Sequence, residues 1–152
     1  MKPWLINGLL LAMVSSGLFI VKAQANAKTE LNITIDGLKS LKGQVCISVF
    51  SSSKGFPSSK NQAVQARCLG VTGASETISF ENLDPGSYAV AVIHDANIDG
   101  KLNRNLLGIP IEGFGFSNNP KILTGPPKFG ESAIIVSGQQ TNIRIQLKYF
   151  GV

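Results

Sequence analysis

The segment VIHDANIDGKLNRN, from Val92 to Asn105, carries the residues whose types and spacing are best suited to chemistry. Asp95, Asn97 and Asp99 place side-chain oxygens at alternate positions, and Gly100 follows them. Calcium binds oxygens from carboxylates, amides and backbone carbonyls, and a glycine at the sixth position of its loops permits a sharp turn. The spacing therefore predicts a calcium loop whose candidate ligands are Asp95, Asn97, Asp99, the carbonyl of Lys101, and Asn103.

The same segment is also compatible with a metal-free polar turn. An EF-hand loop has a bidentate glutamate at its twelfth position, where this chain has Leu106, and no helical pattern flanks the segment. Two carboxylates with several neutral oxygens predict weak binding, with a dissociation constant of about 10⁻⁴–10⁻³ M. Asp and Asn side chains also bond to their own backbone, and IDGK could form a type I′ turn. The residues alone leave both interpretations open.

His94 is the only histidine of the chain, and it stands beside Asp95. Neighbours on a strand point to opposite faces, so adjacency does not make the two residues a catalytic dyad. We expect His94 to be a buried, hydrogen-bonded residue at the base of the loop. The enzymatic alternative is a glycosidase-like hydrolase in which Glu112 works with Asp95 or Asp99, because such hydrolysis needs two carboxyl groups.

The run GFGFSNNP, residues 113–120, offers a second candidate surface. Its two phenylalanines could form the walls of a ligand site, a glycan site for example, while its asparagines supply polar contacts. The alternative is that the aromatic rings fix a long loop onto the core and the asparagines cap turns. The candidate ligand-binding residues are Glu112, Phe114, Phe116, Asn118 and Asn119.

Short segments of alternating apolar and polar residues must position these side chains. Period-two alternation rich in β-branched residues is the signal of a β-strand. Only Phe56–Val64 could form a helical turn or two. Six or seven strands with frequent turns predict an all-β, antiparallel β-sandwich of about seven strands. The expected strands are Leu31–Asp36, Gly43–Phe50, Glu76–Phe80, Ser87–Asp95, Ser132–Val136 and Thr141–Phe150.

The segment from Ala96 to Gly130 does not follow the alternation of a strand. It is rich in Gly, Asn and Pro, yet it also carries phenylalanine, leucine and isoleucine. Disordered segments lack such residues, and long loops in compact domains are usually functional. We therefore expect one long ordered loop, packed at one end of the sandwich.

The amino-terminal residues resemble a secretion signal. Lys2 precedes an apolar run from Leu9 to Val21, and Ala25 and Ala27 form the small-x-small pattern of a cleavage site. We expect a signal peptide over residues 1–27 and a single domain over residues 28–152, exported to the periplasm or outside a bacterial cell. An uncleaved anchor is the alternative, although the run is short for a membrane span, and we expect no span after cleavage.

Cys46 and Cys68 would enter an oxidising compartment after export, where cysteine pairs usually form disulfides. Two buried free thiols are the alternative. The 14 basic residues of the chain fall to 12 without Lys2 and Lys22, against 9 acidic ones, a net charge of +3. Because these charges are scattered rather than clustered, nucleic acid is not an expected partner.

Three stretches resemble a known bacterial family. They are LDPGSYAVAVIHDANIDGKLNRNLLGIPIEGFGFSNNP (Leu83–Pro120), GPPKFGESAIIV (Gly125–Val136) and GQVCISVFSSSKGFP (Gly43–Pro57). They resemble the small exported proteins of the domain of unknown function 2141 (DUF2141) family. The strand pattern L-x-PG-x-Y-x-V also resembles prealbumin-like and carboxypeptidase-regulatory-like sandwiches, which implies the same fold. Asn103 stands where the family often has aspartate, and Phe114 where it often has tyrosine.

The resemblance implies no established activity, so the functional expectation stays broad. We expect a non-catalytic binding or structural module of the cell envelope whose ligand and partner are unknown, with an envelope protein or a glycan as candidate partners. Two more specific hypotheses are that the loop binds a calcium ion weakly, and that the protein is purely structural and binds no ligand.

Overall fold

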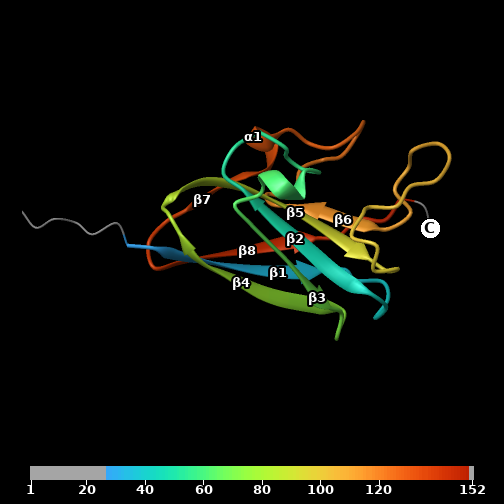
Figure 1. Ribbon diagram of the computed structural model, residues 1–152, viewed down its shortest axis with the longest axis horizontal. Helices are drawn as coiled ribbons and strands as arrows, with labels where there is room; N and C mark the ends of the chain where they lie inside the picture. The colour runs from blue at the N-terminus through green and yellow to red at the C-terminus, as the bar shows by residue number, and fades with distance from the viewer. Residues whose placement is uncertain (1–26, 151–152) are drawn as a thin grey trace, which may run out of the picture.

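A computed structural model describes residues 27–150 as two packed β-sheets (Figure 1). Of the expected signal peptide, residues 1–26 lie outside the described part. The smaller sheet has the order β4 (Ser75–Leu83), β1 (Thr29–Asp36) and β8 (Gln140–Gln146). The larger sheet has the order β3 (Gln65–Gly70), β2 (Gln44–Phe50), β5 (Gly86–Asp95) and β6 (Gly113–Phe116), and β7 (Ala133–Val136) also pairs with β5. The predicted all-β sandwich is confirmed.

One strand pair departs from the expected antiparallel pattern. β1 pairs with β8 in parallel, from Glu30 opposite Gln140 to Asp36 opposite Gln146, whereas the other strand pairs of the described residues are antiparallel. The chain leaves β7 in the larger sheet and crosses to the smaller one, which brings β8 alongside β1 in the same direction. Because period-two alternation is the same in parallel and antiparallel strands, the sequence pattern could not predict that β1 and β8 are parallel.

The main core lies between the two sheets and follows from the alternation. Leu31, Ile33 and Ile35 of β1 are fully buried, and the inward residues of β2 and β5 in the larger sheet face them. Burying a side chain of this size contributes roughly 1.5–3 kcal/mol. The opposing residues are Val45, Ile47, Val49, Val90 and Val92, and Ile145 of β8 lies beside Ile35 in the smaller sheet.

The larger sheet also has an apolar outer face. Phe50, Ala91, Phe114 and Phe116 form a second buried cluster on that side. A 3₁₀ turn, η1 (Lys60–Gln62), and a short helix, α1 (Phe129–Ser132), lie over it in Figure 1. The rings of Phe56 and Phe116 lie edge to face with centroids 6.0 Å apart, which fixes the covering loops to the sheet.

The GFGF sequence of β6 explains how a strand fits where a loop was expected. A Cβ atom added at Gly113 would lie 2.4 Å from the ring of Tyr149, and one at Gly115 would lie 2.7 Å from Ile145. The glycines therefore let β6 approach the chain at the end of β8, while its two phenylalanines face outward. The prediction of a loop throughout Ala96–Gly130 was wrong at this strand, although the segment is ordered.

Two other elements differ from the sequence-based expectation. β3 was not predicted, because its sequence QARCLG lacks alternation and all six of its residues are exposed or half-buried. The helical turn expected within Phe56–Val64 is shorter, at Lys60–Gln62. β3 pairs with β2 so that Cys46 lies directly opposite Cys68, and the two form a disulfide.

Candidate functional site

The loop after β5 is folded around the carboxylate of Asp95, which is fully buried. Its Oδ1 accepts the N–H of Asp99 at 3.1 Å, and its Oδ2 accepts the N–H of Gly100 at 2.8 Å. The side chain of Gln44 donates to Oδ2 at 2.8 Å. A buried carboxylate must be compensated by hydrogen bonds, and these donors from the loop and from β2 supply them.

The turn at IDGK is not of type I′, which would need a positive φ at both Asp99 and Gly100. The positive φ angles fall on Ile98, at 62°, and on Gly100, at 77°. A β-branched residue with positive φ is rare and strained. The hydrogen bonds from the N–H groups of Asp99 and Gly100 to Asp95 hold the backbone in this conformation, and the bond from Gln44 holds the carboxylate itself.

Glu112, in the segment before β6, also holds the backbone of this loop. Its two oxygens accept the backbone N–H groups of Ala96 and Asn103, each at 2.9 Å. The side chain is buried. Glu112 therefore joins the beginning and the end of the loop to the segment before β6, which is a positioning role.

The predicted calcium ligands meet in one hydrogen-bonded cluster. The N–H of Asp99 also approaches Asn97 Oδ1, and the Asp99 carboxylate accepts the side-chain amides of Asn97 and Asn103. The amide of Asn103 and the backbone N–H of Lys101 hold the pKa of Asp99 below its ordinary range. Asn103 Oδ1 is a buried atom that has no hydrogen-bond partner among residues 27–150.

Within residues 27–150, no group of three or more His, Cys, Asp or Glu side chains is placed to hold a metal ion. The calcium hypothesis depends in part on asparagine and carbonyl oxygens, so it stays a prediction.

His94 lies beneath the loop with both ring nitrogens bonded. Nε2 is 2.8 Å from the carbonyl oxygen of Lys42, which can only accept, so Nε2 carries a proton. Nδ1 is 2.8 Å from the hydroxyl of Tyr149, whose pKa burial raises. His94 is 2% exposed and connects β5 with the chain after β8. This is the buried, hydrogen-bonded position expected for it.

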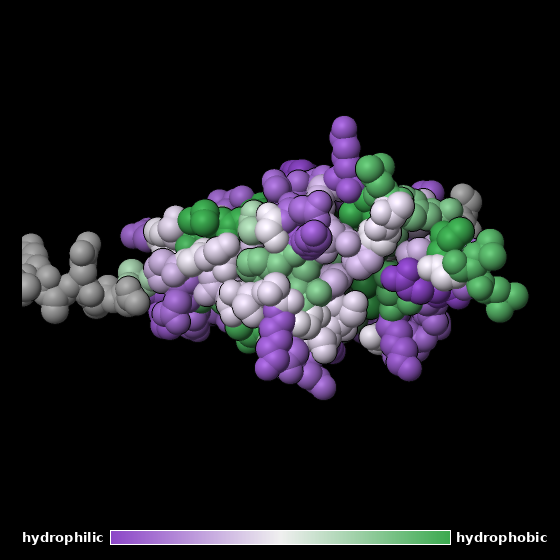
Figure 2. Space-filling view, turned by 90° about the horizontal axis from the view of Figure 1, so that it is seen from above, coloured by the Kyte–Doolittle hydropathy of each residue, from purple (hydrophilic) through white to green (hydrophobic). Residues whose placement is uncertain are grey.

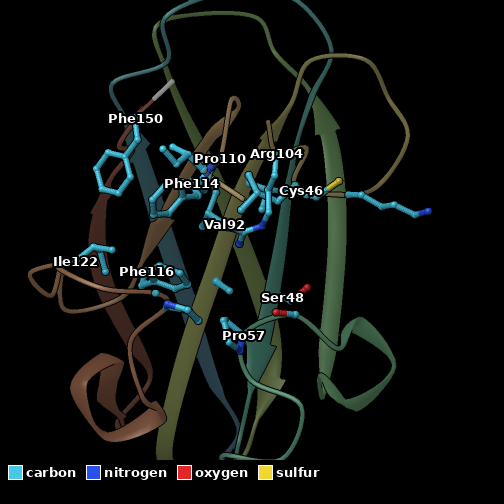
Figure 3. A pocket seen from close by; sticks show the side chains of 18 of the residues that line it. Cys46, Ser48, Pro57, Val92, Arg104, Pro110, Phe114, Phe116, Ile122 and Phe150 are labelled. Carbon is cyan, nitrogen blue, oxygen red and sulfur yellow. The ribbon is translucent and has the colours of Figure 1, made fainter. Parts of the chain in front are cut away.

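An apolar cavity of about 530 Å³ lies on the outer face of the larger sheet (Figure 3). Its floor is made by outward-facing side chains of β2, β5 and β6, among them Ser48, Ile93, Phe114 and Phe116. Residues from 57–60, 100–110 and 122–126 form its walls, with Phe150 at one side. The volume falls within the range of about 300–1,000 Å³ that is typical of small-molecule sites.

The charged residues at this cavity are all basic. Lys60, Lys101 and Arg104 line it, and no aspartate or glutamate among residues 27–150 does. Arg104 also donates from Nη1 to the carbonyl of Gly108 at 2.8 Å, which holds its guanidinium near the wall. An anionic group at the wall would thus be attracted by these basic side chains and would not be repelled by a carboxylate there.

The five predicted ligand-binding residues fall in different places. Phe114 and Phe116 line the cavity, whereas Glu112 closes the neighbouring loop. Asn118 donates to the carbonyl of Glu131, and Asn119 bonds the backbone of β8 through Arg144 and Gln146. Both asparagines have positive φ and hold the turn after β6.

The sequence did not indicate that several cavity residues lie together. Ser48, Leu102 and Ile122 come from distant segments, although Leu102 and Ile122 belong to the long loop that was expected to be functional. Outward apolar residues on β5 were a second indication, because AVAVI is apolar on both faces of the strand. A strand that is apolar on both faces must be covered on both sides.

These features define the class of the molecule: a small two-sheet β-sandwich with an apolar, basic-walled cavity on the outer face of its larger sheet. The chain belongs to the bacterial family described as "Uncharacterized protein conserved in bacteria (DUF2141)", which it matches over residues 33–144. Comparison with curated proteins and with solved structures gave no match. No helix among residues 27–150 has the length and apolar character to cross a membrane.

Proposed function

We propose that this protein is an exported, non-catalytic binding module that holds an amphiphile with an anionic head group in the cavity on its larger sheet. One observation carries the proposal: the 530 Å³ apolar cavity has Lys60, Lys101 and Arg104 on its wall and no acidic residue from the described part of the chain. Its aromatic and aliphatic floor suits a hydrocarbon chain, and the basic wall suits a carboxylate or a phosphate.

Binding is favoured over hydrolysis by the positions of the acidic residues. Paired-carboxylate hydrolysis needs two carboxyl groups facing the substrate. Asp95 and Glu112 are buried and already accept backbone N–H groups, and neither lines the cavity. An amphiphile is also favoured over a glycan, because Asn118 and Asn119 bond the backbone and do not line the cavity.

The test uses a single tryptophan as a reporter. The only tryptophan of the sequence is Trp4, so the chain from Lys28 onward, which includes every strand and core residue described, has none. Phe150→Trp places one at the cavity wall. We expect saturable changes in its emission with dodecanoate, weaker binding of dodecanol, and the weakest binding of dodecyltrimethylammonium.

A matched pair of variants locates the site. Ser48→Phe, combined with the Phe150→Trp reporter substitution, fills the cavity floor and should abolish the response. Ser87→Phe places the same ring on an exposed position of β5 outside the cavity and should leave it intact. Equal affinity for the three dodecyl compounds, or binding that survives Ser48→Phe, would contradict the proposal.

A second candidate function, weak calcium binding in the loop, is favoured by Asn103 Oδ1, which lies next to Asp99 and has no hydrogen-bond partner in the described part of the chain. The oxygens of Asp95 are already engaged by backbone N–H groups, which supports a weak site rather than a tight one.

Thermal melts of the wild-type chain and of Asp99→Ala, in excess EDTA and in millimolar calcium, test this candidate. A ligand at 100 times its dissociation constant adds about 2.7 kcal/mol, which would shift the midpoint by several degrees. We expect a smaller, saturable shift that Asp99→Ala removes. Identical wild-type melts in EDTA and calcium would reject the calcium site.

A further inference from the structure

A small hairpin projects beside the cavity. Arg104 pairs with Pro110 in an isolated antiparallel bridge, and the N–H of Asn105 donates to the carbonyl of Ile109 at 2.9 Å. Leu106 and Leu107 therefore occupy the tip. The hairpin belongs to the orange loop at the right-hand end of the molecule in Figure 1.

The tip exposes large apolar side chains. Leu106 is 107% exposed and Leu107 is 82% exposed. Leu123, on the next loop of the cavity wall, is 87% exposed. Figure 2 shows hydrophobic residues gathered at this end of the molecule. Scattered exposed leucines are ordinary, but a group on ordered loops around a cavity is typical of a docking surface.

Several backbone groups of the tip are hydrogen-bonded within the hairpin, although the side chains are not covered. Asn105 Oδ1 accepts the N–H of Leu107 at 2.9 Å and that of Ile109 at 3.1 Å. The carbonyl of Gly108 accepts from Arg104. Such a tip can enter an apolar medium without leaving these N–H groups unpaired, which is the main cost of placing a loop in a bilayer.

The charges around the exposed leucines are mainly basic. Lys101 and Arg104 stand in the same loop, and Lys121 stands two residues before Leu123. Asp99 is the one exposed acid between residues 95 and 130, since Asp95 and Glu112 are buried. Anionic lipid head groups would complement this arrangement, whereas a neutral or cationic surface would not.

We propose that this end of the protein docks on a lipid bilayer with anionic head groups, inserting Leu106, Leu107 and Leu123 while Lys101, Arg104 and Lys121 contact the head groups. The docking surface is distinct from the cavity floor, so the inference goes beyond the proposed function. It places the cavity wall against the bilayer, from which an amphiphile could enter directly.

Vesicle sedimentation of the chain from Lys28 onward tests the proposal. We expect binding to vesicles of equal parts phosphatidylcholine and phosphatidylglycerol, and much weaker binding to phosphatidylcholine alone. Raising the salt from about 0.1 M to about 1 M should weaken the binding, because the Debye length falls from about 10 Å to about 3 Å. The combined variant Leu106→Ser and Leu107→Ser should lower the partition coefficient about tenfold or more.

Matched controls separate the surface from general hydrophobicity and charge. Ile135→Ser removes an exposed apolar residue, 68% exposed, from β7, and it should leave vesicle binding unchanged. Lys101→Gln with Lys121→Gln should weaken binding, whereas Lys54→Gln, at an exposed turn after β2, should not. Circular dichroism melts of each variant confirm that it is folded.

Three outcomes would overturn the docking proposal. They are no sedimentation with anionic vesicles, sedimentation unchanged by the leucine variants, and a leucine-dependent dimer in solution that binds no vesicles, which would make the tip a protein interface. Ser48→Phe should leave docking intact. If the protein binds anionic vesicles but not dodecanoate, only the proposed cavity function is rejected. If it binds dodecanoate but not vesicles, only the docking proposal is rejected.

Discussion

The carboxylate of Glu112 holds the backbone N–H groups of Ala96 and Asn103, residues at opposite ends of one loop. Asp95 holds the middle of that loop through Asp99 and Gly100. Asp95, a predicted metal ligand, and Glu112, a candidate catalytic acid, both position this loop in the structure. They shape the loop that carries Lys101 and Arg104 to the cavity wall.

Glu112→Gln should destabilise the protein by about 1–3 kcal/mol, because one of the two bonded oxygens becomes an NH₂ group facing a buried N–H donor. Urea unfolding followed by circular dichroism measures the change. Glu81→Gln is the control, since its side chain is exposed and accepts no hydrogen bond among residues 27–150. Equal stability of Glu112→Gln and Glu81→Gln would contradict the assigned role.

Glu76 predicts a pH dependence of stability. The backbone N–H groups of Thr72 and Gly73 and the Thr72 hydroxyl hold the pKa of Glu76 below its usual 4.5, with the Thr72 N–H the largest cause. Because the folded pKa is depressed, this stabilisation is fully present above about pH 4.5 and is lost as the pH falls through the folded pKa.

Glu76→Gln should therefore flatten the loss of stability below that pH, as followed by urea midpoints across a pH series. The loss should diminish without vanishing, since Asp36 and Asp99 also have lowered pKa values. If the stability of Glu76→Gln fell with decreasing pH as steeply as that of the wild type, Glu76 would not contribute to the acid sensitivity.

At the scale of elements, β6 depends on two glycines. Gly113→Ala would place a Cβ 2.4 Å from the ring of Tyr149, which is itself held by His94. We expect a loss of about 1–3 kcal/mol, as for overpacked cores. Gly70→Ala, in β3 with no atom within 4 Å of the new Cβ, should change stability by less than about 0.5 kcal/mol. Thermal melts compare the two, and equal losses would refute the packing argument.

The elements were predictable where burial follows a period of two. β1, β2 and β5 have inward valine, isoleucine or leucine at alternate positions, and the sequence placed them within a few residues. β3 was missed because an exposed edge strand needs no apolar face. β6 was missed because alternating glycine and phenylalanine resembles loop chemistry until β8 is seen beside it.

At the scale of the whole molecule, the cavity exists because the larger sheet is apolar on both faces. One face packs on the smaller sheet, and the other is covered by loops that leave about 530 Å³ unfilled. No local pattern could predict this volume, because its lining comes from segments as distant as Cys46 and Phe150. The loop segment predicted from its composition to be functional does supply much of the wall, including Leu102 and Ile122.

Titration of the ¹⁵N-labelled chain from Lys28 onward with dodecanoate, followed by amide chemical shifts, would show whether an anionic amphiphile binds in the cavity. We expect saturable shifts at Ser48, Ile93, Leu102 and Phe116, whereas the amides of β1 and β4 should not shift. Shifts confined to other surfaces, or no shifts at concentrations that saturate the tryptophan reporter, would contradict an anionic amphiphile in this cavity.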